Sequence, residues 1–157
     1  MPRIIFALVF SLSAMLMLSG CGFLGSSPDD GMATPQAQKA VQAAYSQVGK
    51  PYRLGGASPR QGFDCSGLIY WAYKSNGVKV PRRTSDQIRA GYGVSRDDTL
   101  PGDIVVFRMG ARALHTGMYA GGNSFIHSPR KGSNVRMESL SKPYWSKRLV
   151  SIRRVSG

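Results

Sequence analysis

The hydrophobic pattern of this chain changes its period once, near Pro101-Gly102. Upstream of that point, apolar residues recur with helical spacing, and the sequence predicts helices over residues 35–48, 65–75 and 85–90. Downstream, short β-branched and apolar runs separated by turns predict strands over residues 103–108, 115–120, 124–128, 134–138 and 149–154. Helices followed by an antiparallel sheet indicate an α+β domain.

Local signals set the ends of the two longer predicted helices. Thr34 can cap the first helix, with Pro35 at its first position, and Gly49 ends it. Asp64 is a good N-cap for the second helix, and Asn76-Gly77 closes it. The second helix therefore begins at Cys65, directly after a Gly-rich loop.

The position of Cys65 favours nucleophilic chemistry. A thiolate is the reactive form of Cys, and N–H groups at a helix start stabilise it. The same N–H groups could stabilise an oxyanion. A Cys at one position is more often simply a small buried apolar residue, so the interpretation depends on a second group that could act as a base.

His115 and His127 supply such groups, and they are the only two histidines of the chain. They flank the predicted Gly121-Gly122-Asn123 turn and are symmetric about residue 121. Directly opposed residues of a hairpin have Cβ atoms about 4.5–5.5 Å apart, so the two rings could hydrogen-bond. One would serve as base while the other fixes its tautomer. The chemical alternative is a zinc site on Cys65, His115 and His127, although no CxxC or HExxH spacing supports a metal.

Residues 1–20 have the pattern of an export signal. One charge, at Arg3, precedes an apolar run from Ile4 to Leu18, which has the length of a signal-peptide core and falls short of a comfortable membrane span. The alternative is a buried N-terminal helix. The run ends in Leu18-Ser19-Gly20-Cys21, which resembles the cleavage box of bacterial lipoproteins.

That box implies that Cys21 becomes the mature N-terminus and carries lipid, which would attach the chain to a membrane. Gly22 in place of Asp favours the outer membrane over the inner one. Residues 21–35 are rich in Gly, Ser, Pro and Asp, which predicts a flexible tether behind the lipid. The alternative for Cys21 is a disulfide with Cys65.

The formal net charge is +13, which favours polyanionic partners. The chain has no nucleic-acid-binding motif and no basic helix, so we expect no nucleic-acid partner. For an exported protein, anionic polymers of the cell envelope are a better match. A solvated basic surface with no dedicated partner is the alternative.

Over residues 36–155 the sequence resembles the NlpC family of bacterial cell-wall cysteine peptidases. The resemblance rests on ordered motifs: Pro51-Tyr52-Arg53-Leu54-Gly55-Gly56, Phe63-Asp64-Cys65-Ser66-Gly67-Leu68, Val80-Pro81-Arg82, Pro101-Gly102-Asp103, His115-Thr116-Gly117-Met118-Tyr119 and Phe125-Ile126-His127. It implies one compact papain-like α+β domain over residues 36–157, with the nucleophile at a helix N-terminus packed on an antiparallel sheet. Thr116 departs from the usual His-Val-Gly motif but has nearly the same shape as Val.

The resemblance also implies roles. Cys65 matches the nucleophile, His115 the base and His127 the polar residue that orients the base. Tyr52 matches a residue that lines the site and contacts substrate or oxyanion; its alternative is a packed aromatic. Asp64 and Ser66 match residues that contact peptide in some relatives; their alternative is helix capping.

Family membership implies a peptidoglycan endopeptidase that needs no metal or cofactor. It would cleave stem-peptide or cross-link amide bonds near D-Glu or meso-diaminopimelate through a Cys thioester. The expected partners are peptidoglycan stem peptides, a membrane through the lipid on Cys21, and anionic envelope polymers. Two other functions fit the same fold: a non-catalytic wall-binding lipoprotein, and an envelope amidase or acyltransferase.

Overall fold

A computed structural model describes residues 32–155 of the chain. The expected signal segment, Cys21 and residues 21–31 of the expected tether lie outside the described residues. No helix within residues 32–155 is both long and apolar enough to cross a membrane.

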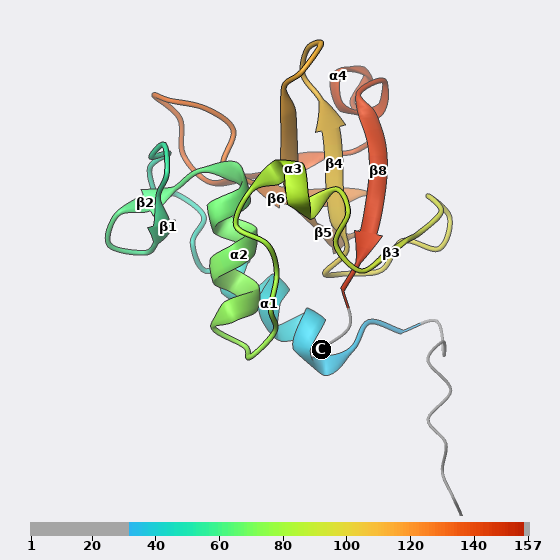
Figure 1. Ribbon diagram of the computed structural model, residues 1–157, viewed down its shortest axis with the longest axis horizontal. Coiled ribbons are helices and arrows are strands. Elements are labelled where there is room, and N and C mark those ends of the chain that lie inside the picture. The colour runs from blue at the N-terminus through green and yellow to red at the C-terminus, as the bar shows by residue number, and fades with distance from the viewer. Residues whose placement is uncertain (1–31, 156–157) are drawn as a thin grey trace, which may run out of the picture.

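Two helices precede the main sheet (Figure 1) and begin where their caps predict. Helix α1 spans Pro35–Tyr45 and α2 spans Cys65–Lys74. The Thr34 side chain accepts the Ala37 N–H at 3.1 Å, and the Asp64 side chain accepts the Gly67 N–H at 2.7 Å, which confirms both caps. Helix α1 ends before residue 48 because the chain continues in tight turns up to Gly49, whose φ is 91°.

Six antiparallel strands form the main sheet in the order β3-β8-β4-β5-β6-β7. Their bounds are β3 Tyr92–Gly93, β4 Ile104–Arg108, β5 Leu114–Gly121, β6 Ser124–His127, β7 Arg136–Ser139 and β8 Leu149–Arg154. The five strands predicted from the sequence are all present. Helices followed by an antiparallel sheet confirm the α+β class.

Four short elements were not predicted from the sequence: β1, β2, β3 and α4. Strands β1 (Ala57–Ser58) and β2 (Gly62–Phe63) form a small hairpin inside the segment predicted as loop, and β3 forms one edge of the main sheet. Helix α4 (Pro143–Ser146) is a single turn, as is α3 (Thr84–Gln87), which replaces the longer helix predicted over residues 85–90. Strands of two residues show no alternation that could identify them.

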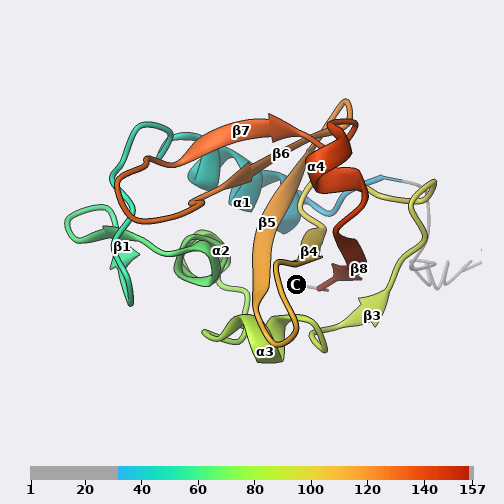
Figure 2. The same cartoon turned by 90° about the horizontal axis from the view of Figure 1, so that it is seen from above.

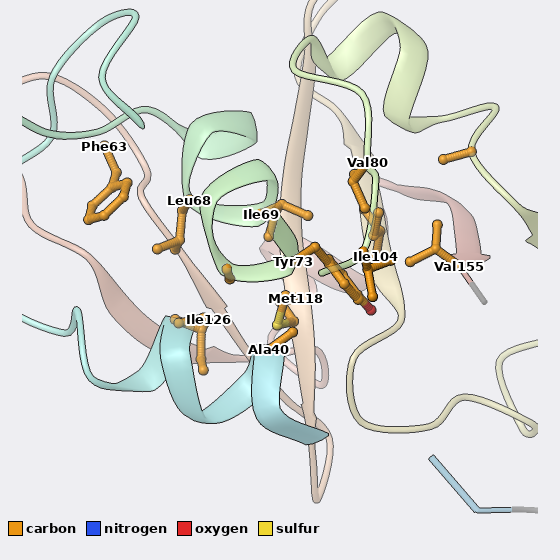
Figure 3. Close-up of a cluster of buried hydrophobic side chains, with 14 of the residues drawn as sticks. Ala40, Phe63, Leu68, Ile69, Tyr73, Val80, Ile104, Met118, Ile126 and Val155 are labelled. Carbon is orange, nitrogen blue, oxygen red and sulfur yellow. The ribbon is translucent and has the colours of Figure 1, made fainter. Parts of the chain in front are cut away.

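One face of the sheet packs against α1 and α2. Leu68, Ile69 and Tyr73 of α2 are buried in one cluster with Ile104, Met118 and Ile126 of β4, β5 and β6 (Figure 3). Viewed from above (Figure 2), α2 lies on one side of β5 and α4 on the other. The helix that carries Cys65 is therefore anchored on the strand that carries His115.

The opposite face carries a second buried cluster, which α4 covers. It contains Val105, Phe107, Phe125, Leu140, Trp145 and Ile152. Successive residues of a strand point to opposite faces. Phe107 pairs with His115, and Phe125 is two residues from His127, so both histidines belong to the face of this aromatic cluster.

Candidate active site

Cys65 is the first residue of α2 and has a free, partly exposed thiol. No protein acceptor within residues 32–155 takes the backbone N–H of Cys65 or of Ser66. Unpaired N–H groups at a helix start point outward and attract negative charge. The site therefore has donors for a thiolate or an oxyanion.

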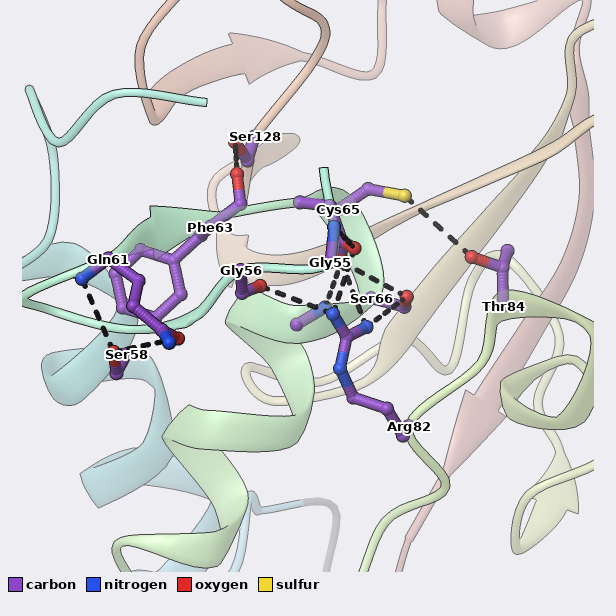
Figure 4. Close-up of polar contacts among 12 residues, drawn as sticks. Gly55, Gly56, Ser58, Gln61, Phe63, Cys65, Ser66, Arg82, Thr84 and Ser128 are labelled. Atoms are coloured by element: carbon purple, nitrogen blue, oxygen red, sulfur yellow. Dashed lines mark hydrogen bonds and ion pairs between the residues drawn. The ribbon is translucent and has the colours of Figure 1, made fainter. Parts of the chain in front are cut away.

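Within the described chain, the one hydrogen-bond contact of Cys65 Sγ is with the Thr84 hydroxyl at 3.7 Å (Figure 4), and no hydrogen bond joins it to His115. Catalytic hydrogen bonds are often long in the absence of substrate. Thr84, at the start of α3, was not predicted as a site residue.

Asp64 is held by a partner that the sequence analysis did not assign. Arg82 donates from both terminal nitrogens to the two carboxylate oxygens at 2.9 and 2.8 Å, and also donates to Ser66 Oγ at 3.0 Å (Figure 4). The backbone N–H of Gly55 adds a further bond at 2.8 Å. This bidentate pair offsets the negative charge of Asp64 beside the sulfur. Asp64 thus caps the helix with Arg82 as its counter-ion, and the Ser66 hydroxyl bonds to both.

Gly67 allows the loop to approach the start of α2. A Cβ at this position would lie 2.0 Å from the Gly56 carbonyl oxygen. That oxygen accepts the Asp64 N–H at 3.1 Å, so the loop and the helix start are joined at the point of closest approach. Only glycine fits there without moving the backbone next to Cys65.

The two imidazoles meet as expected, with His115 Nε2 lying 2.8 Å from His127 Nδ1. The predicted register was nevertheless wrong by two residues. Met118 pairs with Ile126, so His127 lies across from Gly117 and the two histidines form a diagonal pair. The turn is centred between Gly122 and Asn123 instead of on Gly121, which moves the register by three residues, and a bulge between Tyr119 and Gly121 takes one of them back. A shift of two residues keeps both side chains on one face, and their rings can still touch.

Burial keeps both rings neutral at neutral pH. It lowers the pKa of His115 to about 4 and, together with the charge of a protonated His115, lowers the pKa of His127 to about 3. Because Nε2 of His115 is engaged by His127, Nδ1 is the ring nitrogen outside the pair, and it can take a proton in the tautomer in which Nε2 carries the hydrogen. His115 is therefore a neutral base with one committed and one available nitrogen.

Trp145 covers both rings and was not predicted as a site residue. Its ring stacks on His115 with centroids 5.6 Å apart and meets His127 edge-on at 5.0 Å. It is 5% exposed and donates its Nε1–H to Glu138 at 3.3 Å. The single turn of α4 thus shields the two imidazoles from solvent on one side.

The edge of β5 is open where His115 lies. The β5–β6 pairs begin at Met118, so His115 pairs only with Phe107 of β4. One residue after β6 ends, Ser128 donates its hydroxyl to the Phe63 carbonyl at 2.7 Å. The segment that leads into Cys65 is therefore tied to the end of β6, beside the unpaired part of β5.

Tyr52 lies close to the sulfur. It bridges to Phe63, and burial together with the charges of Cys65 and Asp64 raises the pKa of its phenol. The phenol therefore stays protonated at neutral pH and can donate a hydrogen bond. The role of Tyr52 in contacting substrate or oxyanion stays a prediction.

A cleft of about 460 Å³ opens beside His115 on the side of α4 and β7. Its other lining residues include three cations and one acid: Arg130, Arg136, Lys142 and Glu138. Within residues 32–155, no group of three His, Cys, Asp or Glu side chains is arranged to hold a metal ion.

Several known proteins are similar to this chain in sequence and in fold. A family model described as the NlpC/P60 family matches residues 49–154. The murein DD-endopeptidase MepH of Escherichia coli (strain K12) is 43% identical over 129 residues, covering 76% of this chain and 48% of MepH. The gamma-D-glutamyl-L-lysine dipeptidyl-peptidase of Bacillus subtilis (strain 168) is 39% identical over 121 residues, covering 75% of this chain and 40% of that protein.

A solved structure gives the same result. The crystal structure of an NlpC/P60 family protein from Bacillus cereus ATCC 10987 matches with a TM-score of 0.71 at 33% identity, covering 78% of this chain and 41% of that one. This similarity confirms the expected papain-like α+β fold. The chain spans less than half the length of each of these three proteins.

Proposed function

The chain belongs to the NlpC/P60 family, and we propose that it is a peptidoglycan endopeptidase that hydrolyses peptide amide bonds through Cys65. The observation that carries the proposal is the 2.8 Å bond between His115 and His127, because it orients a neutral imidazole whose other ring nitrogen lies outside the pair. That imidazole lies at the open edge of β5, beside the segment leading into a helix whose first residue is a free thiol.

The proposed reaction is acyl transfer to water. Cys65 Sγ attacks the scissile carbonyl carbon while His115 Nδ1 takes the thiol proton. The proton then passes to the leaving amine, the C–N bond breaks, and a thioester remains on Cys65. His115 next takes a proton from water, which attacks the thioester and releases the acid and the thiol. His127 holds the ring of His115 in place throughout.

Negative charge on the carbonyl oxygen develops twice in this sequence. The unpaired N–H groups of Cys65 and Ser66 are the proposed oxyanion donors, with the Tyr52 hydroxyl beside them. Arg82 keeps the Asp64 carboxylate from opposing this charge. We therefore assign Asp64 and Ser66 a supporting role rather than direct contact with substrate.

The test is digestion of purified sacculi with the products resolved by mass. The wild-type chain is expected to release soluble peptide fragments, and Cys65→Ala is expected to release none. Equal release by the two would overturn the nucleophile assignment. Binding of sacculi without release by either would instead indicate a non-catalytic wall-binding protein.

The product masses also identify the bond. The names of the two relatives specify different bonds, one that of a murein DD-endopeptidase and the other a γ-D-glutamyl-L-lysine linkage. Separation of cross-linked dimers into monomers would indicate cross-link cleavage, whereas shortened stems would indicate cleavage within a stem. Loss of whole stems from the glycan, or transfer of acyl groups, would indicate the amidase or acyltransferase alternative.

We further propose that the chain is exported and anchored in the envelope by lipid on Cys21, with the outer membrane favoured by Gly22. The support is the sequence pattern of residues 1–22, and the charge of +13 would add attraction to anionic envelope polymers. Cys21→Ser is expected to move the protein from the membrane fraction to the soluble fraction. Unchanged fractionation would contradict the anchor.

A further inference from the structure

We propose that Glu138, the only glutamate of the chain, is a positioning residue that fixes the tautomers of His127 and His115. The effect on catalysis rests on the proposed function, because the tautomer of His115 affects the reaction only if His115 is the base. The arrangement itself stands on the contacts of the described residues. No motif quoted from the sequence includes Glu138.

The three side chains cross three neighbouring strands on one face of the sheet. His115 lies on β5, His127 on β6 and Glu138 on β7. Glu138 pairs with Phe125, two residues from His127, so each step of the series runs along a diagonal. His127 Nε2 lies 3.9 Å from Glu138 Oε1.

His127 Nε2 makes no hydrogen bond among the described residues, and the charged group beside it is the Glu138 carboxylate at 3.9 Å. The atom is fully buried. A buried polar group without a partner is costly. The nearest acidic group is the Glu138 carboxylate, so a proton on Nε2 points toward a negative charge and a lone pair there would be repelled. The carboxylate therefore favours the Nε2–H form of His127.

This choice determines the state of His115. With its proton on Nε2, His127 Nδ1 is an acceptor, and the 2.8 Å contact requires His115 Nε2 to be the donor. His115 Nδ1 then carries no proton and can accept one from Cys65. In the opposite tautomer of His127, Nδ1 would donate, His115 Nε2 would accept, and His115 Nδ1 would be protonated and unable to act as a base.

The carboxylate is itself fixed in position and charge. Lys142 donates to Oε2 at 2.7 Å, Trp145 donates to Oε2 at 3.3 Å, and Arg136 donates to Oε1 at 2.9 Å. Burial raises the pKa of Glu138, but the bonds from Lys142 and Trp145 and the charge of Arg136 outweigh it and leave the pKa below its usual value. Glu138 is thus ionised at neutral pH, and three donors hold its carboxylate on the side of His127.

The direct test reads the ring tautomers by two-bond ¹H–¹⁵N NMR, which is simple to assign in a chain with two histidines. In the wild-type chain, both rings are expected to carry the proton on Nε2. A wild-type His127 protonated on Nδ1 would overturn the proposal without any variant.

Glu138→Met keeps the side-chain length but removes the acceptor, and is expected to shift His127 toward the Nδ1–H form. The matched controls are Arg136→Met and Lys142→Met, which break the ion pairs but keep the carboxylate, and in which the wild-type tautomers should persist. Unchanged tautomers in Glu138→Met would overturn the proposal, as would an equal shift in the two controls.

Kinetics separate positioning from a general effect on the fold. Glu138→Met is expected to lower kcat on a soluble stem peptide roughly tenfold, similar to other losses of a group that orients a functional imidazole, with KM nearly unchanged. In a His127→Ala background, Glu138→Met should cause no further loss, because the residue through which it acts is gone. A further tenfold loss in that background would contradict the proposal.

The tautomers can be read whether or not the chain cleaves peptidoglycan. A tautomer shift in Glu138→Met combined with inactive wild-type protein on sacculi would refute the proposed function and keep the role of Glu138. If the wild-type protein is active on sacculi but its tautomers do not change in Glu138→Met, the proposed function stands and the role of Glu138 is refuted.

Discussion

Nε2 of His115 lies 2.8 Å from Nδ1 of His127, although the hairpin places the two residues on a diagonal of the sheet. The residue across from His127 is Gly117, and a Cβ there would lie 2.5 Å from the Phe125 ring. The Phe125 ring thus occupies the space above Gly117, and its centroid lies 4.8 Å from that of the His127 ring. Gly117, two residues after His115, makes room for the aromatic ring of Phe125, which packs against the imidazole pair.

The first prediction concerns the acceptor that His127 offers to His115. His127→Ala removes it and should lower kcat about 100-fold, near the lower end of what general base catalysis contributes. His127→Asn can still accept from Nε2–H and should retain more activity than the Ala variant. Peptide release from a stem-peptide substrate checks the order, and equal activity of the two variants would contradict it.

The second prediction concerns the close approach at the start of α2. Gly67→Ala places a Cβ 2.0 Å from the Gly56 carbonyl, so the backbone beside Cys65 has to shift. We expect a loss of unfolding free energy of about 3 kcal/mol, typical of severe overpacking, together with a large loss of activity. Gly110→Ala is the matched control, because its Cβ meets its nearest neighbour at an ordinary 3.9 Å. Urea unfolding checks both variants, and similar stabilities would contradict the prediction.

The third prediction concerns the Asp64–Arg82 pair. Arg82→Met leaves a nearly buried carboxylate without its bidentate partner, which should lower the free energy of unfolding by about 2 kcal/mol. The value is smaller than for a fully buried pair because Arg82 is partly exposed. Arg89→Met removes an exposed pair with Asp86 and should change stability by less than about 0.5 kcal/mol. Equal effects in thermal or urea unfolding would contradict this account.

The fourth prediction concerns the stability of the fold at acidic pH. Burial lowers the pKa of His115 to about 4, whereas the unfolded chain titrates near 6.5. Between these values the unfolded state binds more protons, so stability is fully present above about pH 6.5 and is lost as the pH falls toward 4. His127, with a pKa of about 3, acts in the same direction.

We expect the two histidines to account for a loss on the order of 5 kcal/mol between about pH 7 and about pH 4.5, measured by urea unfolding. The control is the double variant His115→Gln and His127→Gln, which lacks both titrations and should depend less on pH over that range. An equally steep loss in the double variant would assign the effect to other groups.

The sequence predicted the elements that strong local signals define. Thr34 and Asp64 marked helix starts, and the capping bonds of both are present. The hairpin turn was also predicted, but its register was not. Gly122 and Asn123 form a tight turn with φ of 57° and 58°, so the hairpin is not centred on Gly121, and a count about that residue detects neither this offset nor the bulge that partly compensates it.

The residues that the sequence analysis missed act through contacts between distant segments. Arg82 reaches Asp64 across 18 positions, and Trp145 covers His127 from a one-turn helix. No periodicity marks such a residue, because its partner is set by how the strands and helices pack. Arg82 lay within a motif quoted for the family resemblance, which was the only signal that could have singled it out.

The central claim is that the imidazole of His115 activates the sulfur of Cys65. The most direct measurement is the rate at which iodoacetamide alkylates Cys65 at neutral pH, read by peptide mass so that Cys21 does not interfere, in the wild-type chain and in His115→Gln. The account predicts a rate at least about tenfold lower in the variant, since the base that takes the thiol proton is gone. Equal rates in the two proteins would contradict it.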